Sequence, residues 1–363
     1  MISEGIGMGD TRLAAATTVL ESTGVDALLV LGLTNIRYLT GFSGSDGALL
    51  MGRDGQWLLC DGRYTLQARG EATSCTVVEY KVKSDGIAGL VAGQGWRRVA
   101  FDAEQTTVAV HRTLAAAMVG VELLPVAGEL DDLRRVKSAA ELVAIEKSCT
   151  LASEALEQLL PMIRPGVTER SLALELEILM KRAGAEEKAF DFIVAAGERG
   201  ALPHGHPTER VLAAGELVTI DFGARLHGYH SDETVTMAVG SADGRQREIY
   251  GVVKEAHDLA MAAVRPGAGC RELDGIARDH IARCGFGAYF GHGLGHGVGL
   301  EIHEKPTLSP RSEQKLAEGM VVTIEPGIYI PDWGGVRIED TVVVTATGCR
   351  PLTKVAKELR IVG

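Results

Sequence analysis

The chain has 363 residues, which exceeds the usual length of one domain, so two domains are expected. Its 48 acidic and 37 basic residues give a net charge of −11, and since no run of Lys or Arg interrupts this excess, nucleic acid is an unfavourable partner. The sequence begins with no basic and apolar leader and has no run near the ~18 apolar residues of a membrane span, so we expect a cytoplasmic protein with no membrane partner. None of its six cysteines lies in a CxxC pair, so we expect reduced thiols.

The first third of the chain has the pattern of an α/β domain. Short apolar runs alternate with amphipathic stretches, which is typical of strands and helices in turn. The apolar runs are Ala27–Leu31, Ala48–Met51, Trp57–Cys60, Val77–Val78, Val99–Phe101 and Val121–Leu124. The pair Asp54-Gly55 between two of these runs predicts a hairpin turn. The chain becomes charged and loses the strand pattern around 128–138, so we predict domains at 1–135 and 136–363.

The second part contains an internal repeat. After a long helix predicted over 139–160, a helical stretch follows Pro165-Gly166 and closes at Gly184, and a second one follows Pro266-Gly267 and closes at Gly285, with an offset of 101 residues. The strand patterns of 215–221 and 319–325 match at an offset of 104. We therefore predict an α+β domain of two halves, each built as helix, helix and strand and related by a pseudo-twofold axis.

Acidic residues mark the strand ends in both halves. Because side chains two apart on a strand share a face, each carboxylate is expected to point with its neighbouring threonines. Four carboxylates can then converge, namely those of Asp221, Asp232, Glu325 and Glu339. Without countercharge they would repel one another, so the pattern favours a metal site. Glu233 and Asp340 fall on the opposite strand faces and are predicted to be solvated or to lie outside the ligand set.

A glycine-rich run over 291–304 adds three imidazoles. His292, His296 and His303 follow one another at spacings of four and seven residues. The glycines between them would let the backbone approach a ligand closely, and they argue against a helix.

The motifs VTIDFG, HSDET, GHGLGHGVGLEIHE, VTIEPGIYI and GGVRIEDT, in this order, resemble the pita-bread-fold metallopeptidases, which include methionine aminopeptidase, prolidase and aminopeptidase P. The resemblance extends over about 138–361 and implies two divalent metal ions, bridged by Asp232 and Glu339. The implied ligands are Asp221, Asp232, His296, Glu325 and Glu339. A carboxylate-rich site with one imidazole favours Mn²⁺, with Co²⁺, Zn²⁺ or Fe²⁺ left open.

The same resemblance implies roles for residues around the metals. His204, in the motif LPHG, would line the substrate site, and His303 would donate a hydrogen bond to the scissile carbonyl. Glu325 would move a proton to the leaving nitrogen. His292 and Arg337 are assigned to the substrate side of the site, His292 at the proline pocket and Arg337 beside Glu339. Val235 departs from the family pattern, in which many members have Arg, and is expected to change an outer contact only.

The motifs YLTGFSGS and DGRY in the first domain resemble the amino-terminal, creatinase-like domain of aminopeptidase P-like enzymes, a domain that methionine aminopeptidases lack. They predict an Xaa-Pro aminopeptidase, a homodimer that acts on peptides with proline in second position, with an Xaa-Pro dipeptidase (prolidase) as the alternative. A non-catalytic binding module or a metal-independent, creatinase-like amidinohydrolase would require the loss of metal ligands, and all five are present.

Overall fold

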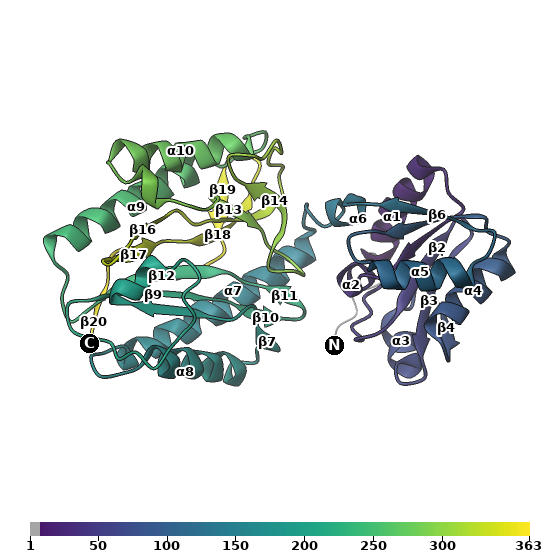
Figure 1. The fold of residues 1–363 in the computed structure, drawn as a ribbon, viewed down its shortest axis with the longest axis horizontal. Helices are drawn as coiled ribbons and strands as arrows, with labels where there is room; N and C mark the ends of the chain where they lie inside the picture. The colour runs from purple at the N-terminus through teal and green to yellow at the C-terminus, as the bar shows by residue number, and fades with distance from the viewer. Residues whose placement is uncertain (1–7) are drawn as a thin grey trace. The chain divides into compact units, whose positions relative to one another are not determined.

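A computed structural model describes residues 8–363 and divides the chain into two compact units that meet between Arg134 and Arg135 (Figure 1). Within the described residues, no helix combines the length and the apolar character needed to pass through a membrane.

The first unit is built on one mixed sheet with the strand order β4-β3-β2-β1-β5-β6. Its strands are β1 (Ala27–Val30), β2 (Ala48–Gly52), β3 (Gly55–Asp61), β4 (Thr76–Tyr80), β5 (Arg98–Asp102) and β6 (Glu122–Val126). Its helices are α1 (Met8–Thr23), α2 (Leu33–Thr40), α3 (Thr65–Glu71), α4 (Lys83–Gln94), α5 (Val108–Ala117) and α6 (Glu129–Asp132). The hairpin predicted at Asp54-Gly55 joins β2 to β3, with Gly52 opposite Gly55. The α/β prediction is confirmed.

The second unit contains the predicted repeat. Helix α8 (Glu169–Arg182) and helix α10 (Cys270–Arg283) keep the offset of 101 residues, and each follows a longer helix, α7 (Ala139–Leu159) or α9 (Gly244–Ala263). The closing glycines adopt the left-handed conformation that favours glycine, with φ of 105° at Gly184 and 89° at Gly285. Figure 1 shows α9 and α10 on one side of the strands and α8 on the other. The helix-helix-strand architecture is therefore confirmed.

The strands of the second unit form a sheet in each half and two smaller sheets. The first half has the order β20-β12-β9-β8 and the second half β14-β13-β15-β18-β19. The first-half strands are β7 (Glu187–Lys188), β8 (Ile193–Ala196), β9 (Leu217–Phe222), β10 (Ala224–Leu226), β11 (Tyr229–His230) and β12 (Glu233–Val239). The others are β13 (Gly295–Gly297), β14 (Glu304–Leu308), β15 (Val321–Ile324), β16 (Gly327–Ile330), β17 (Gly334–Arg337), β18 (Asp340–Val344), β19 (Cys349–Pro351) and β20 (Ile361–Val362). Three short 3-10 helices are η1 (Leu160–Met162), η2 (Gly197–Ala201) and η3 (Gly287–Tyr289).

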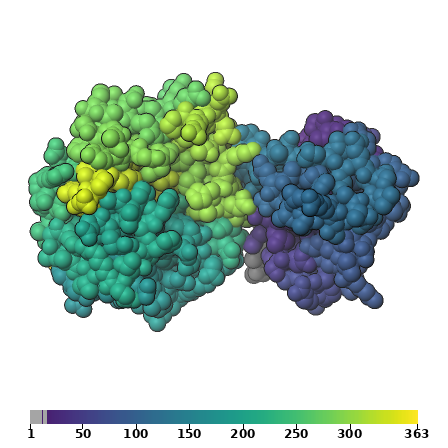
Figure 2. Space-filling model, viewed as in Figure 1, coloured from purple at the N-terminus to yellow at the C-terminus, as the bar shows by residue number. Residues whose placement is uncertain are grey.

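The end of the chain returns from the second half to the first. After β19, the segment 352–360 leads to β20, which pairs in parallel with β12 of the first half. Figure 2 shows the yellow C-terminal residues between the teal first half and the green second half. This path places β20 at the edge of the first-half sheet, beside β12, the strand that follows Asp232.

Candidate metal centre

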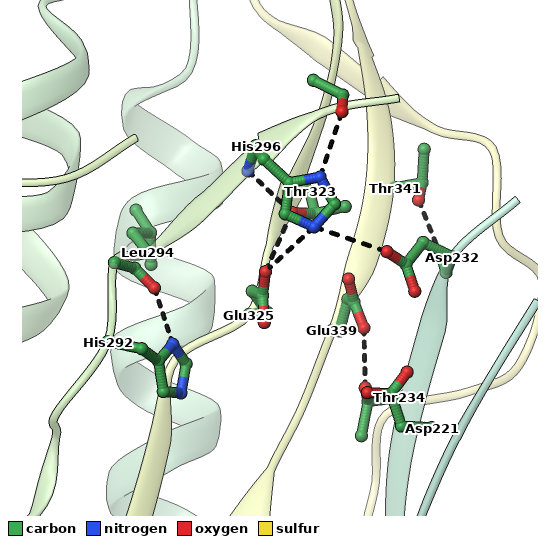
Figure 3. A network of polar contacts seen from close by, with 12 residues as sticks. Asp221, Asp232, Thr234, His292, Leu294, His296, Thr323, Glu325, Glu339 and Thr341 are labelled. Atoms are coloured by element: carbon green, nitrogen blue, oxygen red, sulfur yellow. Dashed lines mark hydrogen bonds and ion pairs between the residues drawn. The ribbon is translucent and has the colours of Figure 1, made fainter. Parts of the chain in front are cut away.

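The five predicted ligands come from strand ends of both halves. Asp221 lies on β9 and Asp232 directly precedes β12, while His296 lies on β13, Glu325 directly follows β15 and Glu339 directly precedes β18. One oxygen each of Asp221, Asp232 and Glu339 lies within 4.8 Å of the other two. His296 reaches the same group, since its Nε2 lies 3.5 Å from Asp232 Oδ2 and 3.4 Å from Glu325 Oε1 (Figure 3). The fold therefore brings all five residues into one cluster.

The hydrogen bonding of His296 fits a metal ligand. Its Nδ1 lies 3.0 Å from the carbonyl oxygen of Gly297, and because a carbonyl only accepts, Nδ1 carries the proton. The Nε2 lone pair then faces two carboxylate oxygens, which are themselves acceptors. A divalent metal ion would satisfy the imidazole and both carboxylates at once, and the donor set suits such an ion.

Electrostatics in the metal-free chain lead to the same conclusion. Burial raises the pKa of Glu325 to about 8, with repulsion from Asp221 adding to the effect of burial and Arg337 opposing it. Burial and repulsion between the carboxylates also hold the pKa values of Asp232 and Glu339 well above their ordinary range. Burial lowers the pKa of His296 to about 4, which keeps the ring neutral and able to ligate. Divalent cations would remove this repulsion.

Asp221 has one oxygen fixed by the protein and one left open. Its Oδ2 accepts a hydrogen bond of 2.6 Å from Arg337, whereas its buried Oδ1 has no hydrogen-bond partner among residues 8–363. A buried carboxylate oxygen without a partner is costly, and a metal ion at this position would satisfy it. The residues thus fit the two metal ions that the sequence motifs imply.

Threonines orient three of the ligands. Thr234 donates to Glu339 Oε2 at 2.6 Å, and Thr341 donates to the carbonyl oxygen of Asp232 at 2.7 Å (Figure 3). Thr323 donates to Glu325 Oε1 at 3.2 Å. Such hydrogen bonds hold a ligand in its binding orientation before the metal arrives.

Arg337 is buried at the end of β17, and its side chain donates four hydrogen bonds to protein groups. Its guanidinium donates to Asp221 Oδ2, to the Tyr329 hydroxyl at 2.8 Å, to Thr234 Oγ1 at 3.1 Å and to the carbonyl oxygen of Pro203 at 3.1 Å. It therefore links a metal ligand to the loop that carries His204. The predicted contact of Arg337 with substrate stays a prediction.

The other predicted histidines lie around the cluster. His303 is exposed, and its ring centroid lies 4.3 Å from that of His296. Partial burial lowers the pKa of His303, and the nearby Asp221 charge opposes this effect. His292 has both nitrogens engaged, Nδ1 with the carbonyl oxygen of Gly293 at 2.7 Å and Nε2 with the Tyr329 hydroxyl at 2.8 Å. His204 is exposed in the loop after η2.

Sequence reasoning missed Tyr329, which connects His292 to Arg337. The sequence contained a signal for this residue. Tyr329 lies between Ile328 and Ile330 on a short strand, so its side chain points to the face opposite theirs. Val235, the position that departs from the family pattern, is buried in the hydrophobic core of the first half, away from the ligands.

Fold and donor set together place the chain among metal-dependent enzymes. The model of metallopeptidase family M24 matches residues 143–346, and the model of the creatinase/prolidase N-terminal domain matches residues 12–136. The chain therefore belongs to metallopeptidase family M24 and carries the creatinase/prolidase N-terminal domain. The predictions of this family, of the pita-bread fold and of a metallo-exopeptidase are confirmed.

Relatives are similar along almost the whole chain. An Xaa-Pro dipeptidase of Pyrococcus furiosus is 39% identical over 356 residues, covering 96% of this chain and 99% of the relative. The structure of an Xaa-Pro dipeptidase from Bacillus anthracis superposes with a TM-score of 0.95 at 38% identity, covering 98% of this chain and 100% of that one. The structure of an X-Pro aminopeptidase from Thermotoga maritima gives a TM-score of 0.90 at 33% identity, covering 97% and 99%.

Proposed function

We propose that this protein is an Xaa-Pro dipeptidase that uses two divalent metal ions. The observation that carries the metal requirement is the contact of the His296 lone pair with the carboxylates of Asp232 and Glu325. The full-length similarity to Xaa-Pro dipeptidases supports the substrate class. This choice reverses the preference for an aminopeptidase that the YLTGFSGS and DGRY motifs suggested, because the Xaa-Pro dipeptidases of Pyrococcus furiosus and Bacillus anthracis, at 39% and 38% identity, are more similar to this chain than the Thermotoga maritima aminopeptidase at 33%.

The proposed ligands are the five residues of the cluster, with Asp232 and Glu339 between the two ions and Mn²⁺ as the favoured metal. Two such ions polarise a carbonyl group and lower the pKa of water. The protein supplies carboxylates at strand ends, of which Glu339 and Glu325 accept side-chain hydrogen bonds from Thr234 and Thr323, while Thr341 holds the backbone carbonyl of Asp232.

Three side chains are proposed to act on the substrate. His303, which is exposed beside His296, would donate a hydrogen bond to the oxygen of the scissile carbonyl as negative charge develops there. Glu325 would carry a proton from the attacking water to the proline nitrogen, a role for which a carboxylate that lies 3.4 Å from His296 at the metal cluster is placed. His204 would border the substrate from the neighbouring loop, which Arg337 ties to the metal cluster through the Pro203 carbonyl.

An Xaa-Pro aminopeptidase is the second candidate, and one observation favours it. A dipeptidase must recognise the free carboxylate of proline, usually with a cation. Arg337 uses four of its five N–H donors on protein groups, so it has little left for a substrate carboxylate.

The two candidates differ in how they treat the end of the substrate. We would compare kcat/KM of the Mn²⁺-loaded enzyme on Ala-Pro, on Ala-Pro amide and on Ala-Pro-Ala. A dipeptidase prefers Ala-Pro and loses rate when the carboxylate is blocked, whereas an aminopeptidase prefers the tripeptide. Ala-Ala serves as the control for proline specificity, and equal cleavage of Ala-Ala and Ala-Pro would refute both candidates.

A further inference from the structure

Two further carboxylates lie directly behind the metal cluster. Glu233 follows Asp232 and Asp340 follows Glu339, and because successive side chains on a strand point to opposite faces, both turn away from the metals. They are not solvated, as the sequence allowed, since Glu233 is 1% exposed and Asp340 is 7% exposed. Two buried anions this close to one another require a compensating charge.

Lys357 supplies that charge. Its Nζ lies 2.5 Å from Glu233 Oε1 and 3.4 Å from Asp340 Oδ1, and its side chain is 6% exposed. Lys357 lies in the segment 352–360, which runs between the two halves before β20. A single ammonium group thus joins a strand of the first half to a strand of the second, on the face opposite to the metals.

The surrounding hydrogen bonds fix this ion triad in place. Ser153 donates to Glu233 Oε2 at 2.5 Å, and Thr353 donates to Asp340 Oδ1 at 2.5 Å. His257 Nε2 lies 3.2 Å from Asp340 Oδ2. The backbone of Lys357 is held as well, because its carbonyl oxygen accepts a hydrogen bond of 2.8 Å from the Tyr250 hydroxyl.

We propose that Lys357 is a positioning residue that sets the separation of Asp232 and Glu339, the two carboxylates placed between the metal ions. On the metal face, three hydrogen bonds join the same strand ends: Glu339 N donates to the Thr234 carbonyl oxygen at 3.1 Å, Thr234 Oγ1 donates to Glu339 Oε2, and Thr341 Oγ1 donates to the Asp232 carbonyl oxygen. Lys357 adds the charged link from behind. The inference rests on the proposed metal site and extends it to a residue that contacts neither ion nor substrate.

Loss of the ammonium group would remove the cation that Glu233 and Asp340 share, and the two strand ends would be free to move apart. Asp232 and Glu339 are covalent neighbours of these residues, so the bridging geometry would change with them. Hydrogen-bonded groups outside the ligand set commonly change metal affinity by about 10- to 100-fold when they are removed. The ion that depends most on the bridging carboxylates should be affected first.

The experiment is a Mn²⁺ titration of metal-free protein by isothermal calorimetry, with the wild type, Lys357→Met and a matched control, Lys354→Met. Lys354 is an exposed lysine three residues away whose Nζ binds Glu146, so its loss leaves the buried triad intact. We expect two ions in the wild type and in Lys354→Met, and a second ion bound about 10- to 100-fold more weakly in Lys357→Met. Lys357→Arg, which keeps the charge, should recover most of the affinity.

A paired variant separates positioning from folding. Lys357→Met combined with Glu233→Gln removes one charge of each sign and leaves Asp340 with His257, so it should fold even where the single variant does not. It still lacks the link and should keep the weakened second site. Wild-type affinity for both ions in Lys357→Met, or in the paired variant Lys357→Met with Glu233→Gln, would overturn the proposal. A wild type that fails to bind two ions would instead refute the metal site itself.

Discussion

Removal of the metal ions should make the stability of the protein fall as the pH rises from 6.5 to 8, because Glu325 has an ordinary pKa of 4.5 and a pKa of about 8 in the folded, metal-free chain. In this interval the folded state holds a proton that the unfolded state has already released. Stability due to a group with a raised pKa is complete below its unfolded value and is lost as the pH climbs to its folded value. The raised pKa values of Asp232 and Glu339 act in the same direction.

The lower limit of the interval is set by the histidines. Burial depresses the pKa values of His292 and His296 from 6.5 to about 4, so these groups increase stability with pH only below 6.5 and contribute nothing further above it. Between pH 6.5 and 8, Glu325 alone should cost about 2 kcal/mol of unfolding free energy, at 1.36 kcal/mol per pH unit. For a domain of this size, that corresponds to a fall in Tm of about 4–8 °C.

The assay is thermal unfolding of chelator-treated protein at several pH values, followed by circular dichroism, for the wild type and for Glu325→Gln. The variant keeps the shape of the side chain but cannot ionise. The difference in Tm between the two proteins therefore removes the contribution of other titrating groups, including His257, whose raised pKa acts in the same interval. Without metal at pH 8, Glu325→Gln should be the more stable protein. A wild type whose metal-free Tm is flat or rises over this interval, in parallel with the variant, would refute the electrostatic reasoning.

Four further substitutions test other parts of the protein. Asp232→Ala should remove most metal binding, measured by elemental analysis, since the residue is placed between both ions; two retained ions would contradict that placement. His303→Ala should leave the metal content unchanged and lower kcat by roughly 10²–10³, and metal loss would make His303 a ligand. Gly295→Ala should strongly destabilise the protein in thermal melts, because the added Cβ would lie 2.0 Å from the carbonyl oxygen of Thr323. Gly275→Ala, in helix α10, should stabilise the protein by about 1 kcal/mol, because its added Cβ would meet no atom within 4 Å and alanine favours a helix.

The sequence by itself indicated the repeat and the convergence of the four carboxylates, because both depend on local signals. Helix α8 begins where Thr168 caps it by accepting from Ser171 N, and it ends before Gly184, whose φ of 105° suits glycine. Asp221 and Glu325 occupy corresponding ends of repeated strands, so the repeat alone indicated that their carboxylates converge. Strand alternation also assigned Glu233 and Asp340 to the face opposite the metals, which the structure confirms.

Only the tertiary structure decided which residues cover that opposite face and which side chains contact the clustered carboxylates. Arg337 and Asp221 are 116 residues apart, and Lys357 and Glu233 are 124 residues apart. No local pattern in the sequence encodes such contacts, because they depend on which strands pair and on the path of the last segment between the halves. Strand periodicity predicts which face of a strand a side chain points to. Whether a carboxylate on that face is buried depends on a partner from elsewhere in the chain. For Glu233 and Asp340 that partner is Lys357, and its contacts accompany the burial of two carboxylates that the sequence left as solvated or outside the ligand set.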